Sequence, residues 1–116
     1  MVDEEKLMER MGDYSLLMLL VDRLKARLPE YLADLSSAID EADAHRLKSE
    51  AHKLKGAIAN FESPTTNAAA LELESMGEQG DLSRAGEVLS GLESNLGQLL
   101  IHLEELCRAQ AAQSEE

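Results

Sequence analysis

Leucine recurs at helical spacing in the last third of the chain, and this pattern constrains the fold more than any other feature of the sequence. Alternating steps of three and four residues separate Leu89, Leu92, Leu96, Leu99, Leu103 and Leu106. This spacing predicts a helix that runs to about Ala112 and carries one narrow apolar stripe. The stripe has to be buried, so the sequence predicts a fold of packed helices.

The rest of the chain also has helical spacing and almost no strand signal. We expect four more helices, at about Glu4 to Arg10, Tyr14 to Ile39, Ala42 to Phe61, and Pro64 to Met76 or Gly77. Caps and breakers set their limits: Gly12 ends the first helix, Asp13 caps the second, Ser63 caps the fourth, a loop runs from Gly77 to Asp81, and Asp81 or Ser83 caps the last.

Pro29 falls inside the second helix, and we expect it to kink that helix rather than divide it. Connections as short as these favour antiparallel neighbours. The predicted fold is therefore all-α, an up-and-down antiparallel four-helix bundle with a short extra N-terminal helix. We expect residues 1–116 to form a single domain whose tail frays at about 110–116.

Composition excludes several classes of function. The chain has 11 basic and 23 acidic residues among 116, a net charge of −12, so nucleic acid and anionic membrane surfaces are repelled on average. Its most apolar run, Leu16 to Val21, is too short to cross a bilayer. The single Cys107 excludes an internal disulfide framework and fits a reducing compartment. We expect a soluble, cytoplasmic protein. We also expect a monomer, because packing within the bundle buries the leucine stripe that could otherwise join two copies of the chain.

The third predicted helix carries the most informative surface. At about 100° per residue, His52 lies about 140° away from the apolar side of this helix. The face around His52 holds cationic and small residues: Lys48, Lys55, Gly56, Ala59 and His45. Between Ala44 and Gly56 there are four basic residues and one acidic residue, a formal charge of +3. The sequence therefore predicts a local positive potential around His52.

Gly56 points to contact with another protein. Glycine within a helix costs about 1 kcal/mol relative to alanine, and here it faces away from the predicted core. We interpret Gly56 and the small Ala59 as room for a partner to approach the imidazole. A neutral imidazole is a nucleophile near pH 7, and the Lys55 ammonium, three residues on, is placed to hold phosphoryl oxygens. These residues suit a phosphohistidine at His52.

The simpler interpretation, a solvated histidine on a charged helix, stays open at this point. His45 lies two turns from His52, about 10 Å along the axis. We interpret it as a surface residue, with partner contact as the lesser alternative. His102 is expected at the boundary of the core. Cys107 is expected to be buried as a small apolar residue.

The run from Glu50 to Gly56, continuing to Asn60-Phe61, resembles the signature of histidine-containing phosphotransfer (HPt) domains, which centres on Ala-His-x-Leu-Lys-Gly. Other features typical of that family are Gly12-Asp13, the acidic turn from Asp40 to Asp43, Leu73-Glu74 and Gly80-Asp81. The resemblance covers about Asp3 to Leu106. One departure is Glu62-Ser63, where many members have Gly-Ala; this changes the helix end and can alter the choice of partner.

The resemblance implies that His52 accepts a phosphoryl group from a receiver-domain aspartyl phosphate and passes it to another receiver. It implies that Lys55 stabilises the phosphate and that Gly56 permits docking. Lys48, Lys53, Ala59 and His45 are the remaining candidate docking residues. The expected partners are response-regulator receiver domains and a sensor histidine kinase. The chain has no ATP-binding motif, so we expect no enzyme activity, cofactor or metal of its own, and Mg²⁺ on the partner receiver domain.

Two alternatives belong to other classes. A helical adaptor would bind a kinase or receiver domain through the same surface without accepting phosphate, and would tolerate glutamine in place of His52. A carboxylate-bridged metal bundle needs Glu-x-x-His pairs. Ser49, Ala42 and Leu99 stand three residues before the three histidines instead. This second alternative therefore ranks last.

Overall fold

The structure of the protein, a computed structural model, describes residues 2–12 and 14–114, and their side chains as far as Ala109. The expected helix cap Asp13 lies outside the described residues. The helical elements are α1 (Glu4–Met11), α2 (Tyr14–Asp40), α3 (Ala44–Ile58), the 3-10 helix η1 (Ala59–Phe61), α4 (Pro64–Gln79) and α5 (Ala85–Ser114). The predicted all-helical fold is confirmed, and the described residues contain no strand.

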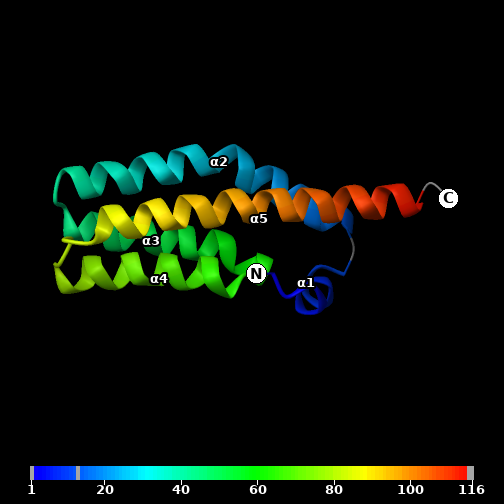
Figure 1. The fold of residues 1–116 in the computed structure, drawn as a ribbon, viewed down its shortest axis with the longest axis horizontal. Coiled ribbons are helices and arrows are strands. Elements are labelled where there is room, and N and C mark those ends of the chain that lie inside the picture. Colours follow the sequence, from blue (N-terminus) through cyan, green and yellow to red (C-terminus); the bar gives the residue numbers. More distant parts are fainter. Residues whose placement is uncertain (1, 13, 115–116) are drawn as a thin grey trace.

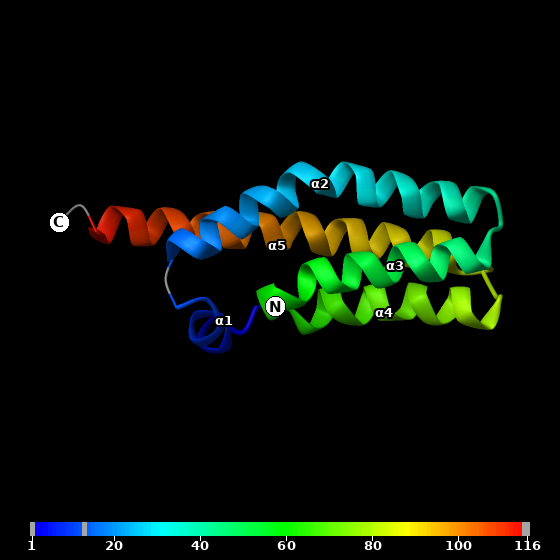
Figure 2. The ribbon, with the colours of Figure 1, turned by 180° about the vertical axis from the view of Figure 1, so that it is seen from behind.

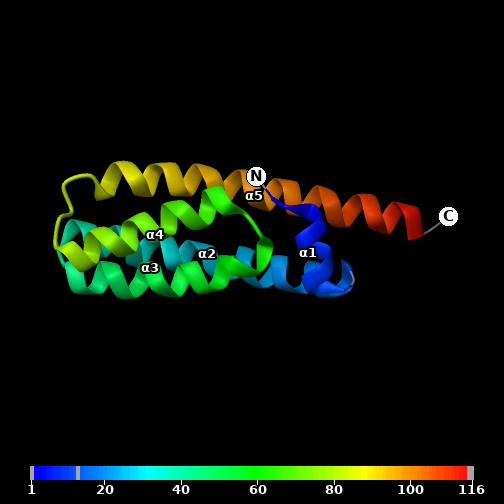
Figure 3. The same ribbon diagram turned by 90° about the horizontal axis from the view of Figure 1, so that it is seen from below.

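The four longer helices lie lengthwise beside one another, which gives a rod of 53 × 22 × 18 Å (Figure 1). Helix α2 packs against α3 and α5, and α4 also packs against α3 and α5. The short α1 lies crosswise to them, beside the connection between α3 and α4 (Figure 3). None of the described helices is both long enough and apolar enough to cross a bilayer.

The apolar stripes of the long helices meet in one aliphatic core. On α5, Leu89, Leu92, Leu96, Leu99 and Leu103 are buried as predicted, and Leu106 is half-buried. The apolar face of α3 is also buried, with Leu47, Ala51, Leu54 and Ile58 in the core and Phe61 buried at its end. Each large aliphatic side chain buried in this way contributes about 1.5–3 kcal/mol. The burial of this face directs the opposite face of α3 outward.

Helix α3 begins at Ala44, two residues later than predicted. Ala42 has a left-handed backbone, with φ of 54°, and therefore closes the turn after α2 instead of starting α3. The amides of Ala42 and Asp43 donate to the carbonyls of Ile39 and Ala38, a Schellman arrangement. The Asp43 carboxylate then caps α3 by accepting the amide N–H of Arg46 at 3.0 Å.

Helix α2 passes through Pro29 as one helix. Figure 2 shows a bend along its length, as expected when a proline removes one helical hydrogen bond. Pro29 is exposed, so its ring does not disturb the core.

Helix α5 begins later than the sequence predicts. The carboxylate of Asp81 accepts hydrogen bonds from the backbone amide and the hydroxyl of Ser83 within the loop. The helix begins only at Ala85, so neither Asp81 nor Ser83 caps it as predicted. The other end lies at Ser114, two residues beyond the predicted Ala112, and the fraying of residues 110–116 stays a prediction. Alanine and glutamine, which dominate this tail, favour helix.

Gly77 is a buried residue of α4, so the prediction that it starts a loop is wrong. A Cβ atom at Gly77 would lie 2.5 Å from the backbone nitrogen of Lys48 and 2.6 Å from the carbonyl oxygen of Ala44. The backbones of α3 and α4 therefore approach so closely that only glycine fits. The chain turns three residues later, at Gly80, whose φ is 73°.

The same substitution at two glycines should have opposite effects on stability. Gly77→Ala should lower the free energy of unfolding by about 1–3 kcal/mol, because the methyl group meets backbone atoms. Gly97→Ala should raise it by up to about 1 kcal/mol, because Gly97 is an exposed α5 residue whose Cβ would meet nothing within 4 Å. Urea denaturation followed by far-UV circular dichroism measures both. A neutral Gly77→Ala would contradict the close approach.

Candidate functional site

His52 projects from the outer face of α3, with 70% of its side chain exposed. Gly56 and Ala59, one and two turns further on, are also exposed. A Cβ atom built on Gly56 would meet nothing within 4 Å. The strip beside the imidazole is therefore open, as the sequence predicts, and the chain itself does not fill the space that Gly56 leaves.

Glu74 of α4 joins His52 to Lys55. Its Oε2 atom lies 3.3 Å from Nδ1 of His52 and 2.9 Å from Nζ of Lys55. The Glu74 side chain is only 16% exposed, so it is held against α3. Sequence reasoning took Leu73-Glu74 only as a family-typical pair and missed this contact. The available signal was an acidic residue directly after a core leucine on a neighbouring helix.

The surroundings of Glu74 keep it ionised. The hydrogen bond from Lys55 is the main reason that the pKa of Glu74 lies below its ordinary value of 4.5; the contact with His52 adds to this and burial opposes it. A carboxylate only accepts hydrogen bonds, so it favours the imidazole tautomer with the proton on Nδ1. The lone pair of the neutral ring then lies on Nε2.

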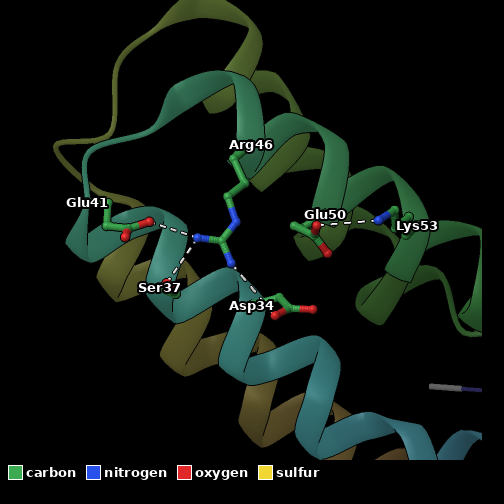
Figure 4. Close-up of polar contacts among 6 residues, drawn as sticks. All are labelled: Asp34, Ser37, Glu41, Arg46, Glu50 and Lys53. Carbon is green, nitrogen blue, oxygen red and sulfur yellow. Dashed lines mark hydrogen bonds and ion pairs between the residues drawn. The ribbon is translucent and has the colours of Figure 1, made fainter.

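The local positive potential expected around His52 is largely cancelled. Each of the four basic side chains in this part of α3 has an acidic partner within 4 Å: Arg46 with Glu41 and Asp34, Lys48 with Glu78, Lys53 with Glu50, and Lys55 with Glu74. Figure 4 shows Arg46 reaching α2 and Lys53 meeting Glu50. The prediction was wrong because a count of charged residues along α3 alone omits the acidic side chains that reach α3 from α2 and α4.

The remaining candidate residues lie apart from this cluster. His45 is exposed near the start of α3. His102 lies at the core boundary as predicted, and its Nε2 is 3.1 Å from Oε1 of Glu4 on α1. Cys107 is buried, which raises the pKa of its thiol. No group of three or more His, Cys, Asp or Glu side chains within the described part of the chain is placed to hold a metal ion.

Glu62 anchors α1 beside the end of α3. Its backbone is left-handed, with φ of 52°, which glycine would adopt more easily. Its carboxylate contacts the Arg10 guanidinium at 2.7 Å, and its carbonyl accepts the amide N–H of Asp3 at 2.9 Å. These contacts link α1 to the end of α3.

Comparison with known proteins assigns the chain to a family. Residues 19–112 match the family model described as Hpt domain. The chain belongs to the Hpt domain family. Its fold is similar to the crystal structure of histidine-containing phosphotransfer protein B (HptB) from Pseudomonas aeruginosa PAO1, with a TM-score of 0.81 and 25% identity over 93% of this chain and 95% of that chain. Comparison with curated proteins gives no match.

Hpt domains are phosphocarrier modules without a catalytic site of their own, and they work with two-component kinases and receiver domains. Family and fold therefore support a phosphotransfer role in two-component signalling for this Hpt domain.

The charge of Glu74 should contribute to stability in a pH-dependent way. Because its folded-state pKa is lowered, this contribution is fully present above the ordinary value of 4.5 and is lost as pH falls through the lowered pKa. The Glu74→Gln variant should therefore be less stable than wild type at about pH 7, with a difference that shrinks as the pH falls below 4.5. Urea denaturation across this range tests it. Glu72→Gln, an exposed change on the same helix, is the control, and a difference for Glu74→Gln that does not vary with pH would contradict the assignment.

Proposed function

We propose that this Hpt domain is a phosphorelay intermediate in which His52 reversibly accepts a phosphoryl group from an aspartyl phosphate of one receiver domain and passes it to another. The observation that carries this proposal is the contact of Nδ1 of His52 with the ionised Glu74, which leaves Nε2 as the nucleophile on an exposed face. We further propose that α2 to α5 form an up-and-down antiparallel four-helix bundle, and that the protein is a cytoplasmic monomer.

In the proposed step the Nε2 lone pair attacks the phosphorus atom of the aspartyl phosphate. The N–P bond forms, the P–O bond to the receiver aspartate breaks, and the aspartate leaves as a carboxylate with the bonding electron pair. Nδ1 keeps its proton and donates a hydrogen bond to Glu74, whose negative charge stabilises the positive charge that develops on the ring. The return transfer runs through the same geometry.

Lys55 lies beside His52 and is the proposed electrostatic partner of the phosphoryl group. Its ammonium contacts Glu74 at 2.9 Å in this structure, so Glu74 holds it one turn from the imidazole. The ammonium then neutralises part of the phosphoryl charge as the group reaches Nε2.

The surrounding residues have docking roles in this proposal. Gly56 and Ala59 leave the backbone of α3 open to a receiver domain, while Lys48, Lys53 and His45 lie around the contact. Receiver domains supply Mg²⁺ and its acidic pocket, and this chain contributes no metal ligand. The phosphoryl group originates from a sensor histidine kinase and arrives through a receiver domain.

Replacement of the histidine tests the proposed function directly. Phosphorylated receiver domains should transfer acid-labile, base-stable label to wild type, and His52→Gln should accept none because it lacks the nucleophilic nitrogen. His102→Gln is the matched control, since it removes a histidine that contacts Glu4 rather than Glu74, and it should accept label at the wild-type rate. Receiver binding that persists in His52→Gln, with no label on wild type from any donor, would instead identify an adaptor.

Gly56 allows a test that separates docking from folding. Gly56→Leu should fold at least as stably as wild type, because mid-helix glycine is unfavourable and the space beside it is open. Phosphotransfer should fall about tenfold or more, because the side chain displaces the partner from in-line geometry. Denaturation curves and transfer rates are compared for Gly56→Leu and the exposed Gly97→Leu. Equal transfer rates in the two variants would exclude docking over Gly56.

A further inference from the structure

Arg23 and Arg27 are two neighbouring exposed cations of α2. Across the described residues, neither has an acidic side chain within 4.0 Å. They lie one turn apart on the exposed side of α2, where two like charges repel each other. The guanidinium of Arg27 lies over the ring of Tyr31, 5.7 Å from its centroid, which orients the side chain without neutralising it.

The two arginines border an apolar groove between α2 and the end of α3. The groove has a volume of about 180 Å³ and includes the half-buried Leu20 and the buried Leu24 and Phe61. Small-molecule sites typically have about 300–1,000 Å³. This groove therefore suits one apolar side chain of a protein partner better than a separate ligand.

The groove lies further around α3 from His52, beyond Gly56. At about 100° per residue, Gly56 lies about 40° and Ala57 about 140° from His52 in the same direction around α3, and Ala57 lines the groove. This direction leads to α2, since Arg46, at about 120° in the same sense, contacts Asp34 and Ser37 of α2 (Figure 4). Figure 2 shows α2 and α3 side by side.

The charge around the groove indicates what it binds. The basic side chains of α3 already have acidic partners in the fold, so Arg23 and Arg27 keep the unneutralised positive charge on this side of the molecule. A chain of net charge −12 repels an acidic partner at a distance. Two unpaired guanidinium groups beside the groove then select the orientation in which carboxylates meet them.

We propose that Arg23 and Arg27 are specificity-determining residues for receiver docking: they bind acidic side chains of a receiver domain that inserts an apolar side chain into the α2–α3 groove. This inference rests on the proposed function and names the chemistry of its partner. The exposed Leu16 and Leu19, in the preceding turns of α2, extend the apolar contact. Receivers without acidic residues beside the inserted side chain are poor partners.

The test compares three double variants with wild type against a panel of isolated receiver domains. Arg23→Gln/Arg27→Gln removes both charges, Arg23→Lys/Arg27→Lys retains them, and Lys25→Gln/Arg108→Gln makes the same change in net charge at exposed positions outside the groove lining. Binding is measured by titration calorimetry at low and high salt, and phosphotransfer as KM and kcat. Thermal unfolding confirms that each variant is folded.

We expect the glutamine pair to weaken receiver binding and raise KM about tenfold at low salt, with kcat little changed and a weaker dependence on salt. The lysine pair should recover most of the affinity, and the control pair should behave as wild type. Equal losses in the glutamine and control pairs, or no loss in either, would overturn the docking role.

The same measurements separate this inference from the proposed function. Receiver binding that depends on the arginines in a wild-type protein that takes no label supports the docking role and excludes the carrier. Normal transfer to His52 with unchanged KM in the glutamine pair excludes the docking role and retains the carrier. A wild type that neither binds receivers nor takes label excludes both.

Discussion

The close contact between α3 and α4 at Gly77 is the constraint on which the site depends. Without a side chain there, the α4 backbone reaches the backbone of Lys48 and Ala44. Glu74, three residues before Gly77 and so about one helical turn away, is thereby held against α3, where one oxygen contacts both His52 and Lys55. A wider spacing would leave the histidine without its hydrogen-bond partner and Glu74 without the hydrogen bond that lowers its pKa. The close approach of two helices at Gly77 thus places Glu74 where it contacts both His52 and Lys55 on the surface.

In this Hpt domain the local charge at each surface depends on which basic and acidic side chains form ion pairs, and the net charge of the chain does not predict it. The acids of α2 and α4 neutralise the basic side chains around His52, so that surface carries little uncompensated positive charge. On α2, Arg23 and Arg27 have no acidic partner in the described part of the chain, and they line an apolar groove. Paired and unpaired charges thus differ in role: Glu74 positions His52 and Lys55 through its contacts, whereas Arg23 and Arg27 are the charges proposed to contact a partner.

Sequence reasoning predicted the features of the fold and of the site that depend on helical periodicity. The leucine stripe of α5, the buried face of α3, the outward His52 and the open Gly56 all follow from helical spacing. The predictions were wrong where two helices contact each other or where the backbone conformation of one residue sets the end of a helix. Gly77 was taken for a loop because glycine commonly ends helices, and Ala42 was taken for helix because alanine favours it, although its left-handed backbone closes a turn. Asp81 and Ser83 form hydrogen bonds with each other instead of capping α5.

The sequence by itself determined where most of each helix runs, which face of each helix is apolar and that His52 projects outward, because these properties follow from residues three and four positions apart. Only the tertiary structure decided that Glu74 meets His52, that Glu78 neutralises Lys48 and that Arg23 and Arg27 have no acidic partner among the described residues. These contacts join different helices and depend on the distance and rotation between them. That geometry is set by the packing of buried side chains and by the space at one glycine, neither of which appears in the spacing along a single helix.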